Sequence, residues 1–422
     1  MNSHDLALFV YNLSLIPIIL FSVLFLLLSI INLLISSGEN SSRKIVYKKI
    51  KHIPFVTVQI PTYNDPVAER CVKQCLTFDY PKNKYEIIIA DDSTNIETQK
   101  LLKKYANQYP NFVKYVHRNN REHFKPGALK NTLKITNGEI IVIFDSDWIP
   151  KKNFLKRIIE PFSDPKIAIV QSGQGIYNKN ANLITRFATY LMMTYHKIVM
   201  PINNRINCVF FCGTAGAIRK SALLEVGGWN VNSITEDSDL TINLLLNGYK
   251  SIYLDFETPS EVPDTFESFI KQQMRWCYGN VRAFIDNAHR IFFNSRLKIP
   301  QKIMILYVTL GNLIAPFVVI MTLSGFLGWF LGEIVLFNIN DLVKFFSVWM
   351  YTSGFLLMGI IVLYKKRQLY DFPYFLLSAL SIGIVLAVAN SIAFFLAIAN
   401  QKLSWFCTPK IANDSFVKNE SS

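Results

Sequence analysis

Four long apolar segments stand out along the chain, one near its start and three near its end. The first is uncharged from Leu6 to Ile35, well beyond the roughly 20 residues that a helix needs to cross a bilayer. The other three cover Ile303–Leu331, Phe345–Tyr364 and Phe372–Ala399. We therefore predict transmembrane helices on both sides of a central polar domain.

Basic residues beside these segments predict how the chain crosses the bilayer, because clustered Lys and Arg next to a membrane helix mark its cytoplasmic side. Such a cluster follows the first segment and consists of Arg43, Lys44, Lys48, Lys49 and Lys51. A second cluster, Lys365-Lys-Arg367, directly follows the third segment. We therefore expect a multi-pass protein of the cell membrane whose N-terminus lies outside and whose central domain is cytoplasmic.

The first and last segments each have an alternative interpretation. A cleaved signal peptide would account for the first segment, but no Lys or Arg precedes it and it is far longer than a secretory signal. The last segment either spans the bilayer or bends near Asn390, which would lay Ser391–Asn400 along the cytoplasmic surface. Hydropathy alone does not choose between these two arrangements.

The central part contains short runs of β-branched residues that end abruptly in polar ones. The runs, each with the polar residues that follow it, are Phe55–Ile60 with Pro61–Asn64, Ile87–Ala90 with Asp91–Ser93, and Ile140–Phe144 with Asp145–Asp147. Such runs are typical of buried parallel strands, and Asn95–Tyr105 and Lys125–Ile135 supply crossover helices. Because ligands bind beyond the carboxyl ends of strands in open α/β sheets, we expect the polar residues at one edge.

Composition and charge narrow the possible partners. The 422 residues are 51% hydrophobic and 18% charged, which excludes global disorder. A net charge of +14 permits nucleic acid, an acidic membrane surface or a phosphorylated substrate as partner. The apolar segments favour the last two, and we expect no nucleic acid.

The six cysteines include no C-x-x-C pair, which indicates a reducing compartment. The histidines lack metal-ligand spacing, so we expect no structural zinc.

Asp145 and Asp147 are separated by one residue at the end of a predicted strand, so their side chains project the same way. Mg²⁺ or Mn²⁺ commonly binds one or two carboxylates together with substrate phosphates. A loop rich in Asp can also be no more than a solvated turn. The position beyond a buried strand, beside Asp91-Asp92, favours a metal that holds a nucleoside diphosphate.

Two further motifs admit both a chemical and a structural interpretation. Thr235-Glu-Asp237 opens a helical pattern and could cap that helix, or Asp237 could be the general base for an acceptor hydroxyl. Gln272-Gln-Met-Arg-Trp276 lies in an amphipathic stretch. It could be an interfacial helix, or Arg275 could bind the leaving phosphates while Trp276 stacks on a sugar.

The order of these motifs resembles the membrane-integrated, inverting family 2 glycosyltransferases, which include cellulose, hyaluronan, chitin and glucomannan synthases. The matching segments are Asp91-Asp92, Asp145-Ser-Asp147, Phe210-Phe-Cys-Gly-Thr214, Thr235-Glu-Asp237, Gln272-Gln-Met-Arg-Trp276, Pro61-Thr-Tyr-Asn64 and Lys125-Pro-Gly-Ala-Leu129. The resemblance implies an α/β fold: a cytosolic, Rossmann-like GT-A domain with a mainly parallel sheet, flanked by transmembrane α-helices.

The resemblance also implies roles for individual residues. Asp237 would be the catalytic base and Asp147 the metal ligand, with Mg²⁺ or Mn²⁺ as cofactor. The residues expected to bind the nucleotide-sugar are Thr62, Tyr63, Asn64, Asp92, Lys125, Asp145, Gln272 and Arg275. Those expected at the acceptor are Cys212, Glu236 and Trp276. The alternative for Cys212 is a buried, inert thiol.

The segment Trp405-Phe-Cys-Thr-Pro-Lys410 is similar to the gating loop of cellulose synthases, in which an aromatic residue, a Thr and a Lys fold over the bound nucleotide. Trp405, Thr408 and Lys410 match that pattern. If the likeness holds, this segment must reach the active site, which favours the bend near Asn390. The alternative is a basic tail that Trp405 anchors at the bilayer surface.

Two stretches depart from the family pattern. Where the glucomannan-like branch has Gln-x-Arg-Trp-Gly-His, this chain has Gln171-Ser-Gly-Gln-Gly-Ile176. Cys277 and Tyr278 replace the small and basic residues expected after Arg-Trp. Because the first stretch lies toward the acceptor by analogy, the sugar and the acceptor class stay open.

We therefore predict an inverting, metal-dependent β-glycosyltransferase that extends a polysaccharide or oligosaccharide from a nucleoside-diphosphate sugar, with a UDP-sugar favoured, and passes it across the bilayer. The alternatives are transfer of one sugar to a lipid acceptor, and a non-catalytic nucleotide-binding subunit of a polysaccharide export complex. The expected divisions are an N-terminal transmembrane helix (1–38), the GT-A domain (39–265), amphipathic interface helices (266–301), C-terminal transmembrane and interfacial helices (302–400) and a tail (401–422).

Overall fold

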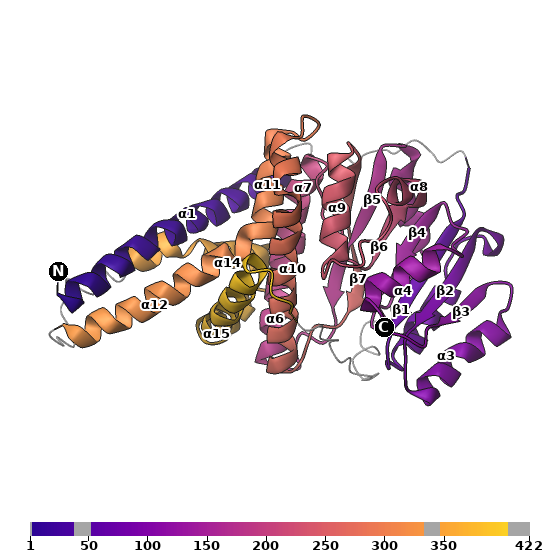
Figure 1. Cartoon of the computed structure of the whole chain (residues 1–422), viewed down its shortest axis with the longest axis horizontal. Helices are drawn as coiled ribbons and strands as arrows, with labels where there is room; N and C mark the ends of the chain where they lie inside the picture. Colours follow the sequence, from indigo (N-terminus) through magenta and orange to yellow (C-terminus); the bar gives the residue numbers. More distant parts are fainter. Residues whose placement is uncertain (1, 38–51, 333–346, 404–422) are drawn as a thin grey trace.

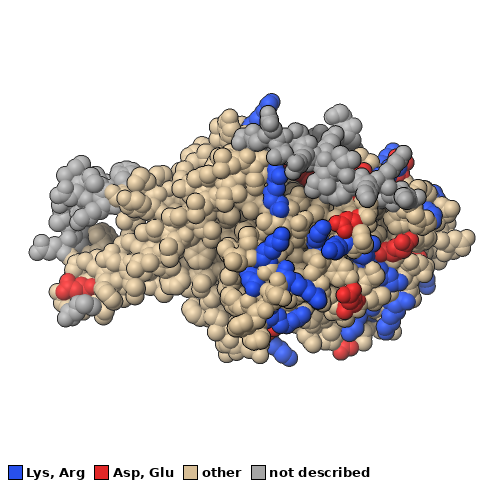
Figure 2. All heavy atoms as spheres, turned by 90° about the horizontal axis from the view of Figure 1, so that it is seen from above, with Lys and Arg blue, Asp and Glu red and all other residues tan. Residues whose placement is uncertain are grey.

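The computed structural model describes residues 2–37, 52–332 and 347–403, which form a sheet domain and a helical part. In Figure 1 the sheet lies on the right, and α1 (Ser3–Ser37) and α12 (Ile314–Leu331) extend together away from it to the left. On the face drawn in Figure 2, charged side chains gather over the sheet domain and are nearly absent from the helical part. This division is that expected of membrane helices attached to a polar domain.

The described strands form a seven-stranded sheet in the order β3-β2-β1-β4-β6-β5-β7. They are β1 (Val56–Thr62), β2 (Tyr85–Asp91), β3 (Val113–His117), β4 (Ile140–Ile143), β5 (Ile167–Ile176), β6 (Gly216–Arg219) and β7 (Lys250–Ser260). β6 is antiparallel to both of its neighbours, and the other pairs are parallel. The mainly parallel sheet is therefore confirmed, with the three predicted strands as β1, β2 and β4.

Helices cover both faces of the sheet. The first face carries α2 (Ala68–Leu76), α3 (Ile96–Gln108) and α5 (Phe154–Ile159), and the second carries α4 (Phe124–Leu133), α8 (Lys220–Glu225) and α9 (Glu236–Leu246). Every residue of β1 and β2 is buried. Burial on both faces explains the continuous apolar run of β2, whereas the buried Thr57 and Gln59 of β1 donate hydrogen bonds to Glu86 and Thr136. The two predicted crossover helices are confirmed as α3 and α4.

A layer of helices separates the sheet from the long apolar helices that extend away from it (Figure 1). It consists of α6 (Leu183–Thr194), a π-helical turn (Tyr195–Val199), α7 (Met200–Arg205), α10 (Phe266–Phe293) and α11 (Ile299–Leu310). α10 contains the predicted amphipathic motif and begins after Thr265, whose hydroxyl accepts the backbone N–H of Ser268 at 3.3 Å. This helix therefore connects the sheet domain with the helical part.

Three described helical segments are long and apolar enough to cross a membrane: Ser3–Ile35, Ile299–Leu331 and Leu369–Ile398. The second is divided by a 3-10 turn at Gly311–Leu313. Its first half, α11, packs on the sheet domain, whereas its second half, α12, lies along α1. The chain thus leaves the sheet domain at this turn.

Small residues allow close contact between α1 and its neighbours. A Cβ atom added to Gly325 of α12 would lie 3.2 Å from the ring of Tyr11. The Gly354 N–H at the start of α14 (Gly354–Lys365) donates to Ser22 Oγ at 2.8 Å. Such contacts are typical of membrane helices, which pack through small and polar side chains.

The bend predicted near Asn390 is wrong, because α15 (Phe372–Ile398) runs past this residue without a break. The Asn390 side-chain N–H donates to Asn312 Oδ1 at 3.3 Å, and the Asn390 backbone carbonyl accepts from the Cys277 thiol at 3.4 Å. These partners hold Asn390 inside the protein, where its Oδ1 is buried without a hydrogen-bond partner among the described residues, and the helix does not turn the residue toward an interface. α15 instead packs against α6 and α10.

The basic triplet that follows α14 lies on the side of the sheet domain, in agreement with the sequence. Lys366 forms an ion pair with Glu257 of β7, which also pairs with Lys197 at 3.0 Å. Lys365 donates to Asn32 near the end of α1. The other predicted basic cluster, residues 43–51, lies outside the described residues.

Candidate active site

The polar ends of β1, β2 and β4 meet at one edge of the sheet. Thr62 at the end of β1 pairs with Asp91 at the end of β2. Ile143 at the end of β4 pairs with Gln59 of β1. Asp92 and Asp145 follow these ends within two residues. The predicted convergence of strand-end carboxylates at one edge therefore holds in the structure.

Four residues other than glycine have positive φ around this edge. They are Asn64, His123, Phe124 and Ala215, with φ between 46° and 55°. Each such conformation costs on the order of 1–3 kcal/mol and persists only where its surroundings hold it. Strain of this kind clusters at functional sites, which agrees with a site at this edge.

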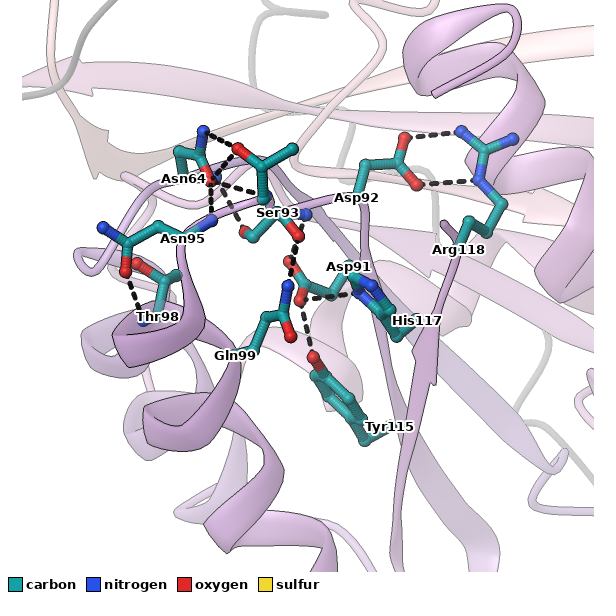
Figure 3. Close-up of polar contacts among 11 residues, drawn as sticks. Asn64, Asp91, Asp92, Ser93, Asn95, Thr98, Gln99, Tyr115, His117 and Arg118 are labelled. Carbon is teal, nitrogen blue, oxygen red and sulfur yellow. Dashed lines mark hydrogen bonds and ion pairs between the residues drawn. The ribbon is translucent and has the colours of Figure 1, made fainter. Parts of the chain in front are cut away.

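Asn64 ties the loops after β1 and β2 together (Figure 3). Its Oδ1 accepts the backbone N–H groups of Thr94 and Asn95, both at 2.8 Å. Its own backbone N–H donates to Ser93 Oγ at 2.7 Å. The structure thus gives Asn64 a supporting role in the loop, and its direct contact with a nucleotide stays a prediction.

Asp91 and Asp92 have different surroundings (Figure 3). Asp91 is fully buried and accepts the Tyr115 hydroxyl at 2.6 Å. Asp92, 5% exposed, forms a two-pronged ion pair with Arg118, at 2.7 Å from Nε and 2.5 Å from Nη2. Arg118 also donates to the Phe124 carbonyl at 3.0 Å. This arginine therefore connects the end of β2 with the start of α4.

Lys125 connects the strand ends with α9. Its Nζ lies 2.7 Å from Asp145 Oδ1, donates to the Gly213 carbonyl at 3.0 Å, and lies 3.9 Å from Glu236 Oε1. Burial alone would lower the pKa of Lys125, but Asp145, Glu236 and Asp237 outweigh burial and raise that pKa. Lys125 is therefore a firmly held cation among carboxylates.

Asp237 stands at the second residue of α9, where its Oδ1 accepts the Ser238 backbone N–H at 2.8 Å. Gly213 lies against it: an added Cβ atom would be 2.9 Å from Asp237 Oδ2 and 3.3 Å from Lys125 Nζ. Gly213 also has φ +75°, a conformation that favours glycine. Three of the predicted motifs thus meet at one point.

Electrostatics links the motif on α10 to the same point. Burial raises the pKa of Asp237, against the opposing effects of Lys125, the Ser238 N–H and Arg275. Burial also raises the pKa of Glu236 to about 7; Lys125 opposes this effect and Asp237 adds to it. Because Arg275 acts on both carboxyls, it lies close enough to α9 to share their charge.

Asp147 lies deeper than Asp145. It is 1% exposed, and its Oδ2 accepts the Glu261 backbone N–H at 3.1 Å. Arg70 pairs with Glu261 at 3.3 Å and donates to the Asp147 carbonyl at the same distance. The side chain of Asp145, in contrast, remains one-third exposed, at 33%.

The two carboxylates of Asp145 and Asp147 fit a divalent cation in kind, since Mg²⁺ and Mn²⁺ prefer oxygen ligands. Among the described residues, no group of three or more His, Cys, Asp or Glu side chains could hold a metal ion. A cation at this point would therefore take its remaining ligands from a diphosphate and water. The assignment of Asp147 to the metal stays a prediction.

On the predicted acceptor side, Cys212 is partly exposed and its backbone N–H donates to Gln171 Oε1 at 3.0 Å. Burial and the charge of Asp237 raise the pKa of its thiol, so Cys212 lies near the base. Gln272 and Trp276 are half-buried on α10. Their contacts with donor and acceptor stay predictions.

At the other end of the site, Thr62 is buried and the ring of Tyr63 is half-buried. The guanidinium of Arg121 lies 3.3 Å from the centre of that ring. A stacked arginine supplies positive charge beside the predicted nucleoside pocket.

The predicted gating residues Trp405, Thr408 and Lys410 lie outside the described residues. Leu403, the last described residue, packs against a buried cluster of α10 and α15, and Ile234 and Met274 pack against the same cluster. Ile234 directly precedes Thr235-Glu-Asp237, and Met274 lies within the motif on α10. The chain therefore reaches the neighbourhood of the site at residue 403, with α15 unbent.

Arg118, Arg121 and Glu261 are parts of the site that the sequence analysis missed. Arg118 directly follows β3, so the rule applied to the other strand ends would have found it. β3 itself was missed because Val113–His117 contains Lys114 and His117 and lacks the apolar run that marks a buried strand.

Two curated relatives resemble a large part of the chain. Probable glucomannan 4-beta-mannosyltransferase 7 of Oryza sativa subsp. japonica is 34% identical over 266 residues, 60% of this chain and 45% of that protein. Glucomannan 4-beta-mannosyltransferase 2 of Arabidopsis thaliana is 32% identical over 268 residues, 61% and 50% of the two chains. The chain spans about half the length of these relatives.

A solved structure has the same fold. The mannosyltransferase PcManGT from Pyrobaculum calidifontis, in complex with GDP-Man and Mn²⁺, superposes with a TM-score of 0.65 at 16% identity, over 93% of this chain and 99% of that one. This confirms the GT-A fold. The family model described as glycosyl transferase family group 2 matches residues 140–396, more than half of the chain. The chain therefore belongs to glycosyl transferase family group 2.

Proposed function

We propose that this chain is a β-mannosyltransferase that transfers the sugar of GDP-mannose to a hydroxyl of a growing glycan. The relatives named glucomannan 4-beta-mannosyltransferases support mannose and a polysaccharide product. The GDP-Man bound to the Pyrobaculum calidifontis protein favours guanine over the uracil expected from the sequence. The observation that carries the proposal is the convergence of Asp237, Lys125 and Arg275 in a domain of this family.

The reaction needs one base and a cationic site for the leaving group. Asp237 accepts the proton of the acceptor hydroxyl, whose oxygen forms a bond to the anomeric carbon while the bond from that carbon to the diphosphate breaks. Attack opposite the leaving group converts an α-linked donor into a β-linked product. Lys125 and Arg275 stabilise the negative charge on the departing diphosphate.

The raised pKa of Asp237 suits a base, because a carboxylate of higher pKa takes a proton more readily at neutral pH.

A divalent cation bound at Asp145 and Asp147 would neutralise charge on the diphosphate. EDTA treatment should therefore abolish turnover, and Mn²⁺ or Mg²⁺ should restore it. Turnover that survives metal removal would contradict metal dependence.

The central experiment offers membranes containing the full chain a panel of sugar nucleotides and measures nucleoside diphosphate release. GDP-mannose with an oligomannoside acceptor should give the highest turnover, and UDP-glucose little. Asp237→Asn should lower transfer by about 10²–10⁴-fold, the usual contribution of a general base, while donor binding is retained. The matched control is Glu97→Gln, which also replaces a carboxylate by an amide, at a side chain that is 82% exposed. This variant should leave turnover unchanged.

Unchanged turnover in Asp237→Asn would remove this residue from the mechanism. Higher turnover with a UDP-sugar would overturn the choice of guanine and leave the base assignment intact. Product length, measured with a radiolabelled donor, separates extension of a glycan from transfer of one sugar to a lipid.

A further inference from the structure

A polar cavity of about 420 Å³ lies on the face of α9 opposite to Asp237. Its walls are the loop after α8, the side of α9 that carries Asp239 and Asn243, and the second half of α10. Asp239 follows Asp237 by two residues, which places the two side chains about 200° apart around a helix of 3.6 residues per turn. The cavity is therefore separate from the candidate active site but shares a helical turn with it.

The wall of this cavity is an ordered hydrogen-bond network. Arg290 Nη1 donates to Asn243 Oδ1 at 2.7 Å and to Asn287 Oδ1 at 3.0 Å, which fixes the orientation of both amides. Their Nδ2 atoms then donate to the Asp239 carboxylate, each at 3.3 Å. Asn230 Nδ2 donates to the same carboxylate at 3.2 Å. Asp239 thus sits among neutral amide donors, with the nearby guanidinium bonded to the amide oxygens.

The chemistry of the wall selects the kind of ligand. Asp286 forms an ion pair with Arg282, and the Arg290 guanidinium lies beside Asp239, so the wall is close to electrically neutral and its described residues offer an anion no unpaired cation. A carboxylate offers about four acceptor positions, and three amide bonds at or beyond the usual upper limit of 3.2 Å leave Asp239 able to accept another donor. A hydroxyl group can donate to a carboxylate and accept from an amide N–H. A neutral molecule with several hydroxyls therefore fits this wall.

The loop side of the cavity is backbone. Gly227 and Gly228 have φ +91° and +79°, and a Cβ atom added to Gly227 would meet nothing within 4 Å. Positive φ, and not crowding, is what requires glycine at position 227. Gly227 is exposed, so the cavity is open to solvent on this side, and its volume falls within the roughly 300–1,000 Å³ typical of small-molecule sites.

We propose that this cavity is a second carbohydrate site, which binds a short neutral oligosaccharide of the same class as the product. Only the choice of sugar rests on the proposed function. Asp239 is the central contact, and its backbone N–H donates to the Thr235 carbonyl at 3.1 Å within the first turn of α9. A sugar bound to Asp239 is therefore attached to the turn that carries Asp237.

The test measures binding of β-1,4-mannotetraose to the detergent-solubilised full chain by calorimetry, without donor. Asn230→Ala removes one wall amide, and Asp286→Asn neutralises a rim carboxylate that pairs with Arg282 and has a side-chain exposure of 52%. Each should weaken binding at least fivefold without changing the thermal unfolding midpoint. Trp276→Ala, at the predicted acceptor site, should leave this binding event in place, and inorganic phosphate should not compete.

The opposite pattern overturns the proposal. Binding that Trp276→Ala abolishes and the cavity variants leave unchanged would place the oligosaccharide in the active site only. No binding at millimolar sugar, or binding of phosphate at the cavity, would also refute it. Because the measurement needs no turnover, its failure is distinguishable from failure of the proposed transferase activity.

Discussion

At the scale of single residues, the contact between Gly213 and Asp237 constrains the predicted base directly. Gly213→Ala places a methyl group 2.9 Å from Asp237 Oδ2 and forces a side chain into φ +75°. The backbone cost is about 1–2 kcal/mol, and a displaced base of this kind costs on the order of 10²-fold in rate. Turnover and thermal unfolding of the variant measure the two effects.

The control for Gly213→Ala is Gly311→Ala, where an added Cβ atom meets nothing within 4 Å and φ is −57°. This variant should keep full turnover. Equal losses in the two variants would show that the effect of Gly213→Ala has no link to Asp237.

Glu236 predicts a pH dependence of stability. Its pKa is about 7 in the folded protein, whereas a carboxyl in an unfolded chain titrates near 4.3. Because the folded state binds this proton more tightly than the unfolded state, protonated Glu236 stabilises the folded state. This contribution is complete below about pH 4 and is lost as the pH rises through about 7. The thermal midpoint of the native chain should therefore fall by a few degrees relative to Glu236→Gln between pH 5 and 8. Parallel profiles would show that Glu236 does not titrate in this range.

At the scale of elements, the packing of α9 on α10 keeps Asp237 within electrostatic reach of Arg275. Gly279 of α10 faces Thr235: an added Cβ atom would collide with the threonine Cγ2 and lie 2.7 Å from its hydroxyl. Ser238 Oγ donates to Asn280 Oδ1 at 2.7 Å beside this contact. The glycine therefore sets the distance between the two helices.

Gly279→Ala should lower both stability and transfer. Alanine gains about 1 kcal/mol of helix propensity, but overpacking a filled contact costs typically 1–3 kcal/mol, so we expect a net loss. Thr235→Ala in the same chain removes most of the clash and should recover part of the turnover. A fully active Gly279→Ala variant would show that this helix contact is not needed for the reaction.

Several elements were predictable because their signals are local. β2 and β4 are predicted by short apolar runs, β1 by its β-branched residues, and α1 by an uncharged segment long enough to span a bilayer. β3 was not predictable in this way because it lies at the edge of the sheet and keeps polar residues. The unbroken course of α15 past Asn390 depends on partners from α10 and the turn before α12, which no local pattern reports.

At the scale of the whole molecule, the helical part predicts how the chain is oriented across a membrane. Lys366 pairs with Glu257, so the turn between α14 and α15 lies on the side of the sheet domain, and α1 carries the N-terminus away from it (Figure 1). The basic residues after α1 predict that this side is cytoplasmic. An epitope tag placed before Met1 should therefore be accessible in intact cells.

The matched control is a tag in the exposed turn between Pro110 and Asn111 of the sheet domain. This tag should be accessible only after permeabilisation. The reverse result would place the sheet domain outside and contradict a cytoplasmic donor site.

The sequence by itself determined the long apolar segments, the polar ends of three strands and the order of the motifs, since each of these depends on neighbouring residues. Only the tertiary structure decided which of them touch. Arg118 reaches Asp92 from 26 residues away and Lys125 reaches Asp145 from 20 residues away. Gly213 meets Asp237 only because a loop beside β6 and the first turn of α9 approach the same sheet edge. Such pairings depend on strand order and helix packing, which arise from burial of the whole apolar surface and are not encoded in any one segment.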